Sequence, residues 1–84
     1  MEATNDTRML GQQIRAKRKE CGLTQSEVAA VAGCSQRFVS ELERGKRTAE
    51  LGKALAVVRA LGCQLGLQPC KVKPYAMRRL EDYL

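Results

Sequence analysis

Four glycines divide most of this chain into short segments of helical periodicity, and their spacing restricts the possible folds more than any other feature. Gly22, Gly33, Gly45 and Gly62 each follow a run in which small or apolar residues recur every three or four positions. Such runs predict amphipathic helices, and a glycine just after the last apolar residue commonly ends a helix. The sequence therefore predicts a mainly α domain built from four short helices.

The first two predicted helices have recognisable ends. Residues 1–7 show no apolar period, so we interpret them as a flexible lead-in whose Asp6 or Thr7 caps a helix over residues 8–21. Gly22 is expected to end that helix in the left-handed conformation. Thr24 and Glu27 have the spacing of a capping box and predict a second helix over residues 25–32. The residues expected to face inward are Leu10, Ile14, Arg18, Cys21, Val28, Ala29 and Ala32.

Two further helices follow the same pattern. Ser35 is expected to cap a third helix that ends at Gly45, and Thr48 a fourth that ends at Gly62. The fourth helix is the more apolar of the two, so we expect it to be the core partner of the others. The residues expected to be buried on these helices are Phe38, Val39, Leu42, Leu51, Ala54, Leu55, Val58 and Leu61.

After Gly62 the apolar period changes from 3.6 to 2. Cys63, Leu65 and Leu67 alternate with polar or small residues up to Pro69, which predicts a short β-strand over residues 63–68. A lone strand cannot satisfy its backbone hydrogen bonds, and the chain offers no second strand. We therefore expect this dimerisation strand to pair with its counterpart in a homodimer. An extended tail that lies on its own domain is the alternative.

Composition favours a binding protein over an enzyme. The chain of 84 residues has no histidine, which removes the commonest general base and metal ligand. Between residues 8 and 59, eleven basic residues stand against five acidic ones, a balance that suits a polyanion or, alternatively, a solvated basic surface. Cys34 is a weak candidate nucleophile, because no base accompanies it. A domain of this size buries only roughly 60% of its unfolded surface, which also favours an oligomer.

The remaining features predict a protein of the prokaryotic cytoplasm with neither cofactor nor metal. The four cysteines lack zinc-site spacing, so we expect free thiols, with a Cys63–Cys70 disulfide as the alternative. Nothing resembles a secretory signal, and no apolar run approaches the roughly 20 residues of a membrane span. Residues 70–84 form a basic tail that is either a fifth, partner-binding helix or disordered.

The segments TQSEVAAVAG and CSQRFVSELERGKR resemble the Cro/C1-type (XRE) helix-turn-helix family. Ala29 lets two helices cross closely, Gly33 permits the tight turn, and Val39 and Leu42 pack the second helix on the first. The resemblance extends over residues 10–67 and implies a lambda-repressor-like DNA-binding domain. Within the family, VVRALG followed by CQLGLQ is most similar to HipB-like antitoxins, whose C-terminal strands pair between subunits.

The family geometry implies two sets of DNA contacts. The third helix would lie in the major groove and present its outer side chains to base edges. The candidates for base recognition are Ser35, Gln36, Arg37, Ser40 and Glu41. Phosphate contacts would come from the start of the second helix and the basic loop after the third. The candidates there are Thr24, Gln25, Arg44, Lys46 and Arg47. Gln25 is assigned through the resemblance, in which a glutamine at this point bridges a phosphate and the third helix; an exposed polar residue in a first turn is the alternative.

Arg18 is the one cation expected on an apolar helix face. In phage repressors an arginine of the first helix commonly meets a glutamate near the end of the third, so the resemblance pairs Arg18 with Glu43 as a structural ion pair. The sequence therefore suggests a dimeric, autoregulating repressor that binds a palindromic operator, and the resemblance to HipB-like antitoxins implies a HipA-like kinase toxin as a partner. A regulator without a toxin and a module that binds only protein are the alternatives.

Overall fold

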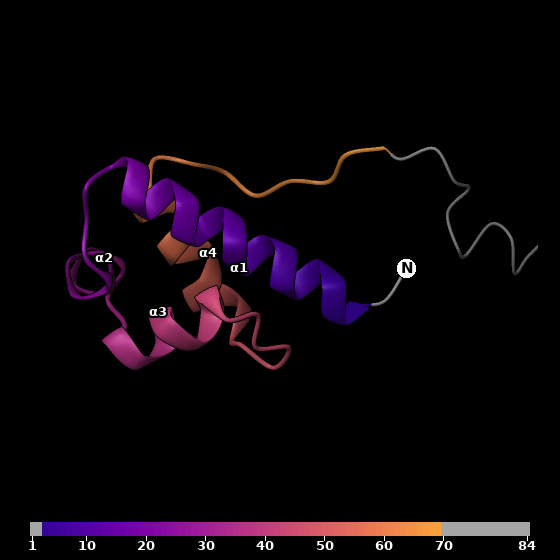
Figure 1. Cartoon of the computed structure of the whole chain (residues 1–84), viewed down its shortest axis with the longest axis horizontal. Coiled ribbons are helices and arrows are strands. Elements are labelled where there is room, and N and C mark those ends of the chain that lie inside the picture. The colour runs from indigo at the N-terminus through magenta and orange to yellow at the C-terminus, as the bar shows by residue number, and fades with distance from the viewer. Residues whose placement is uncertain (1–2, 70–84) are drawn as a thin grey trace, which may run out of the picture.

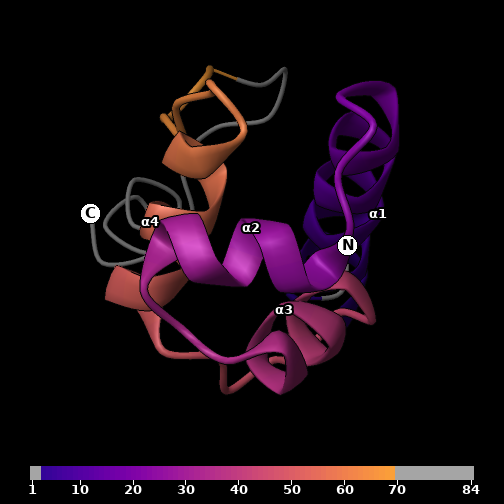
Figure 2. The same cartoon turned by 90° about the vertical axis from the view of Figure 1, so that its left-hand side faces the viewer.

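Four helices make up the part of the chain that the computed structural model describes, which is residues 3–69, with side chains from residue 6 onward. They are α1 (Ala3–Glu20), α2 (Gln25–Ala32), α3 (Gln36–Glu43) and α4 (Leu51–Ala60). The long α1 runs across the molecule above α3 (Figure 1), and α2 crosses the space between α1 and α4 (Figure 2). Helix α2 packs against both α3 and α4, and α1 packs against α3.

The predicted ends of α2 and α3 are confirmed. The hydroxyl of Thr24 accepts a hydrogen bond from the backbone N–H of Glu27 at 3.1 Å, and the Glu27 carboxylate accepts one from the N–H of Thr24 at 2.8 Å. This is the reciprocal capping box. Ser35 caps α3 by accepting a hydrogen bond from the N–H of Phe38 at 3.0 Å. Gly33 has a φ of 75°, in the left-handed region, at the turn between the two helices.

The predicted starts of α1 and α4 are wrong. Helix α1 begins at Ala3 rather than Arg8, so neither Asp6 nor Thr7 caps it. Residues 3–7 contain no glycine or proline, and the helix continues through them. Helix α4 begins at Leu51, because the carboxylate of Glu50 accepts a hydrogen bond from the N–H of Lys53 at 2.7 Å and takes the capping role predicted for Thr48.

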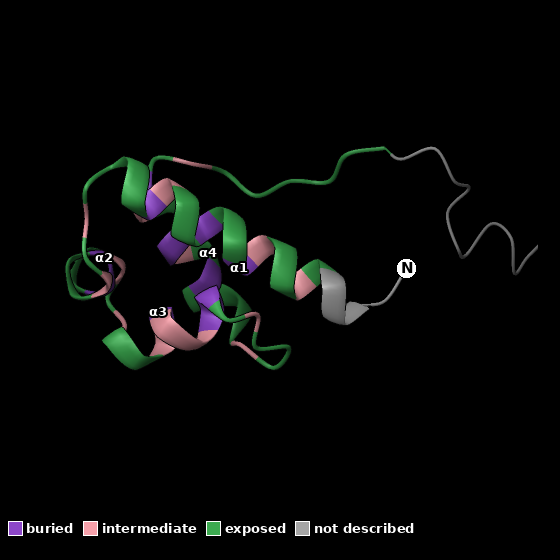
Figure 3. Ribbon diagram, in the orientation of Figure 1, coloured by how far each residue is buried: buried purple, intermediate pink, exposed green. Residues whose placement is uncertain are grey.

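The core lies where the inner faces of the helices meet (Figure 3). Val57 of α4 is fully buried, although it was not among the predicted core residues, and Leu51, Leu55 and Cys21 are exposed. The buried face of α4 is centred on the positions spaced three and four apart from Ala54, which leaves both leucines at its edges. The buried apolar residues are Ile14, Val28, Ala29, Val39, Leu42, Ala54, Val57, Val58 and Leu61.

Helix α1 approaches the end of α3 closely because both sides of the contact carry glycine. A β-carbon added at Gly11 would lie 2.5 Å from the carbonyl oxygens of both Leu42 and Glu43. One added at Gly45 would lie 2.7 Å from the α-carbon of Arg8. Real β-carbons do not make such contacts, so the two glycines set the distance between these helices.

The predicted strand over residues 63–68 is not formed. Residues 63–69 are assigned to no regular element, because a β-ladder needs a partner and nothing in the described part of the chain pairs with them. Leu67 is fully exposed and Leu65 is about half exposed. The predictions for residues 70–84, and the alternative of a Cys63–Cys70 disulfide, lie outside the described residues. Of the helices in the described range, none is sufficiently long and apolar to cross a membrane.

Candidate functional site

Helix α3 has one buried face and one polar outer face. Val39, Leu42 and Glu43 are buried, whereas Gln36 and Arg37 are exposed and Ser40 is partly exposed. This division follows from the sequence, since the two sets alternate with helical spacing. The outer face therefore presents polar side chains that the core does not need for packing.

Three of the predicted base-recognition residues are held by contacts within the domain. Ser35 uses its hydroxyl oxygen to cap α3. The side-chain carbonyl of Gln36 accepts a hydrogen bond from the hydroxyl of Ser26 at 3.1 Å, which links the start of α3 to the start of α2. Glu41 lies between Arg37, at 3.4 Å, and Lys46, at 3.2 Å. The hydrogen bond from Lys46 lowers the pKa of Glu41, although burial opposes this change.

Arg37 has the most freedom of the charged side chains on α3. Its side chain is 86% exposed, and its only ion pair in the described chain is the long contact with Glu41. An exposed pair of this kind contributes little to stability, so little free energy opposes its exchange for another partner. Arg37 can therefore turn outward to a ligand that faces α3.

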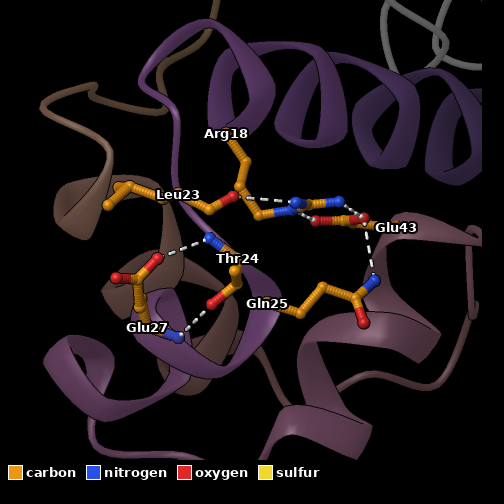
Figure 4. A network of polar contacts seen from close by, with 6 residues as sticks. All are labelled: Arg18, Leu23, Thr24, Gln25, Glu27 and Glu43. Carbon is orange, nitrogen blue, oxygen red and sulfur yellow. Dashed lines mark hydrogen bonds and ion pairs between the residues drawn. The ribbon is translucent and has the colours of Figure 1, made fainter.

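A buried polar network connects α1, α2 and α3 (Figure 4). Arg18 donates hydrogen bonds to both carboxylate oxygens of Glu43, at 2.6 and 3.0 Å, and a third to the carbonyl oxygen of Leu23 at 2.9 Å. Gln25 donates its amide to the same carboxylate at 3.1 Å. Arg18 and Glu43 are only 9% and 7% exposed. The arginine that the sequence placed on an apolar face thus has a full set of partners.

The network keeps Glu43 ionised. Burial raises the pKa of Glu43, but the hydrogen bonds from Arg18 and Gln25 and the charges of Arg18 and Arg15 outweigh it, and the pKa lies below its ordinary value. The hydrogen bond that Arg18 donates to Glu43 raises the pKa of Arg18 despite its burial. Both partners therefore remain charged near neutral pH, and the bidentate geometry is retained.

The structure separates the predicted phosphate-contact residues into two places. Gln25 and Arg44 line a hollow of about 620 Å³ with Ser40 of α3. Lys46 and Arg47 lie around the loop after α3 and line a different hollow, beside Leu10 and Leu42. Thr24 lines neither of these two hollows, and its hydroxyl oxygen is engaged in the cap of α2.

Three residues of α1 that the sequence reasoning missed complete the first hollow. Arg8, Gln12 and Arg15 line it opposite Gln25 and Arg44. Their spacing of four and three residues puts them on one helix face. That spacing could have indicated a polar face on α1, but the basic residues between positions 8 and 59 were considered only as a total. The close approach of α1 to α3 at Gly11 is what brings this face to the site.

No metal site was found in the described part of the chain, where no three His, Cys, Asp or Glu side chains are suitably grouped. Burial raises the pKa of the Cys34 thiol, and the charge of Lys53 offsets this only in part. A raised thiol pKa is the opposite of what a nucleophilic cysteine requires.

Comparisons with known proteins place these features among transcriptional regulators. A family profile described as helix-turn-helix matches residues 14–68. The uncharacterised HTH-type transcriptional regulator y4mF of Sinorhizobium fredii is 47% identical over 58 residues, which make up 69% of this chain and 76% of that protein. The immunity repressor protein of Bacillus phage phi105 is 39% identical over 56 residues, or 67% of this chain and 39% of the repressor.

A solved structure shares the arrangement of the helices. The restriction-modification controller protein C.AhdI from Aeromonas hydrophila superposes with a TM-score of 0.68 at 30% sequence identity. The superposition covers 76% of this chain and 93% of the controller protein.

Proposed function

The chain belongs to the Cro/C1-type helix-turn-helix family of transcriptional regulators, and from this premise we propose that it is a repressor whose α3 recognises a specific operator in double-stranded DNA. The observation that carries the proposal is the division of α3 into a buried face and a free polar face. Arg37, with its side chain 86% exposed, is the residue best placed to reach a base. A guanidinium can bind O6 and N7 of guanine together.

The neighbouring residues support the same role. Ser26 orients the amide of Gln36, whose geometry suits N6 and N7 of adenine. Ser40 and Glu41 lie one turn further along the outer face. The carboxylate of Glu41 contacts Arg37, so it orients that arginine when it is not itself accepting a hydrogen bond from a cytosine amine.

We propose further that the functional unit is a homodimer on a palindromic operator. Leu65 and Leu67 project from an extended segment that has no ladder partner in the described chain. Pairing of the segment that contains Cys63, Leu65 and Leu67 with the same segment of a second copy would satisfy the backbone hydrogen bonds along the facing edge of each. A dimer of this kind has half-sites about 34 Å apart.

The role as antitoxin to a HipA-like kinase is the most specific part of the proposal. It rests on the resemblance of VVRALG and CQLGLQ to HipB-like antitoxins. Co-expression with a kinase encoded beside the gene tests it, because a stable complex on gel filtration is expected. A kinase that elutes alone would leave a DNA-binding regulator without a toxin.

Fluorescence anisotropy against the DNA upstream of the gene tests the central claim. The parent protein is expected to bind this duplex about a thousandfold more tightly than a scrambled duplex. Arg37→Ala should lose most of this preference, whereas Arg59→Ala, which removes an exposed charge from α4, should keep it. Equal binding of both duplexes by the parent would contradict operator recognition at this site and favour the module that binds only protein.

A further inference from the structure

We propose that the hollow between α1, α2 and α3 is a binding site for the DNA phosphate backbone, with Arg8 and Arg15 of α1 as contacts in addition to Arg44. This inference rests on the proposed function, because it names the part of the DNA that lies beside the bases read by α3. It adds α1 to the two regions from which the sequence predicted phosphate contacts.

The hollow carries an uncompensated positive charge. Arg8, Arg15 and Arg44 line it, and none of them takes part in an ion pair within the described chain. Its one acidic lining residue is Glu43, whose carboxylate is buried and already accepts hydrogen bonds from Arg18 and Gln25. The charge of that carboxylate also acts on Arg15, but it is already paired with Arg18, so the three guanidinium groups leave the hollow with a net positive charge.

The other residues that line the hollow offer hydrogen-bond donors, which suit an oxyanion. Gln12, Gln25 and Ser40 contribute amide and hydroxyl donors. The start of α2 adds to them, because the N–H group of Gln25, the first residue of the helix, has no partner within the helix. The capping box occupies the N–H groups of Thr24 and Glu27 and does not involve that of Gln25. The dipole of α2 also favours a negative charge at this end.

The position of the hollow points to backbone rather than to a free anion. Ser40 belongs both to the lining and to the partly exposed side of α3, so the hollow is continuous with the face that carries Arg37. A duplex that brings bases to Arg37 therefore brings a strand of phosphates over Ser40 and Arg44. The lining of the hollow comes from α1, α2, α3 and the residue after α3, so that strand would meet groups from all of them.

The salt dependence of binding provides the test, since each phosphate contact contributes a slope of about 0.9 to the plot of log K against log salt concentration. Arg15→Gln and Arg8→Gln should each lower this slope by about 0.9. Both should weaken binding to upstream and scrambled duplexes by the same factor, because phosphates carry no sequence information. Arg15→Lys should keep the slope of the parent.

Arg59→Gln is the matched control, because it removes the same charge from α4, where Arg59 lines another hollow beside Leu55. An unchanged slope in Arg15→Gln and Arg8→Gln, or a decrease equal to that of Arg59→Gln, would overturn the proposal. This failure differs from failure of the proposed function, in which the parent itself does not prefer the upstream duplex. Thermal melts of each variant verify that the fold is retained.

Discussion

At the scale of single residues, Glu43 is the charged side chain whose hydrogen bonds join three helices. Its carboxylate accepts hydrogen bonds from α1 through Arg18 and from α2 through Gln25, while its own backbone belongs to α3. Helix α3 is therefore connected to both α1 and α2 through one carboxylate. The desolvation of that group is offset only while the donors are present.

Replacement of Glu43 by alanine should destabilise the domain strongly. Loss of one partner of a buried ion pair typically costs about 3 to 5 kcal/mol. We expect a decrease near the lower limit, about 3 kcal/mol, because Arg18 keeps its hydrogen bond to the carbonyl oxygen of Leu23. Urea unfolding followed by circular dichroism measures it. Glu41→Ala, at an exposed pair on the same helix, should change little, and equal stability of the two variants would contradict the structural role of Glu43.

The same carboxylate predicts loss of stability in acid. The pKa of Glu43 is lowered in the folded state, so the unfolded chain binds its proton first as the pH falls. The contribution of Glu43 is complete above the unfolded pKa of about 4.3 and is lost as the pH falls from there through the folded pKa. Glu43→Gln should remove this part of the pH dependence in urea titrations. A parent and a variant with parallel curves below that pH would refute the prediction.

The resemblance supplied the pairing of Arg18 with Glu43, and simple spacing supplied the outer face of α3. What the sequence could not supply was the choice among competing partners. The resemblance assigned Gln25 to bridge a phosphate and the third helix, and the structure shows which side chain of that helix its amide reaches, the carboxylate of Glu43. Arg8 and Arg15 reach the site only because two backbones approach closely at Gly11, a contact between residues distant in the sequence.

At the scale of elements, the ends that depend on neighbouring residues were predicted correctly. Thr24 with Glu27, and Ser35, bond the first turn of their own helices, so a local pattern identifies them. The cap of α4 was missed because threonine is a preferred N-cap residue and glutamate is not, whereas the structure places Glu50 at the cap. The start of α1 was missed because the absence of an apolar period does not prevent a helix from forming.

Gly11→Ala should destabilise the contact between α1 and α3 even though alanine favours helices. Propensity alone would stabilise α1 by about 1 kcal/mol. A methyl group 2.5 Å from two backbone carbonyl oxygens cannot be accommodated without moving α1, which costs about 1 to 3 kcal/mol or more. The net result should be a lower melting temperature in calorimetry.

Gly52→Ala in α4 is the matched control for this substitution. Its added methyl group would meet the carboxylate of Glu50 at 3.1 Å, which is the end of a side chain and not backbone, although this carboxylate also caps α4. We therefore expect Gly52→Ala to melt closer to the temperature of the parent than Gly11→Ala does. A stabilised Gly11→Ala would show that α1 does not press on the end of α3.

At the scale of the whole molecule, the domain leaves apolar side chains without cover. Leu67 is fully exposed and Leu65 is about half exposed. Leu55 of α4 is also exposed and lines a hollow together with Leu65. The strand predicted from the alternation of these residues has no ladder partner within residues 3–69, so residues 63–69 form no regular element. In the proposed homodimer, a second copy would supply that partner.

Leu67→Asp should therefore weaken the homodimer without unfolding the monomer, because Leu67 makes no packing contribution where it is fully exposed. Sedimentation velocity over a range of concentrations measures the change, and weaker binding to a palindromic duplex should accompany it. Gln68→Asp introduces the same charge on the other side of the extended segment and should have a smaller effect. A parent that sediments as a monomer at all concentrations would refute strand pairing.

The outward side of α3 contributes almost nothing to the interior, since Val39, Leu42 and Glu43 supply its packing. Substitutions at Gln36 and Arg37 are thus nearly free of consequences for folding. Under the proposed function, two such regulators that arise by gene duplication can diverge at these positions, acquire different target sites and stop interfering with each other while their shared scaffold stays unchanged. Rewiring of a circuit then requires only a few changes, all on one turn of one helix.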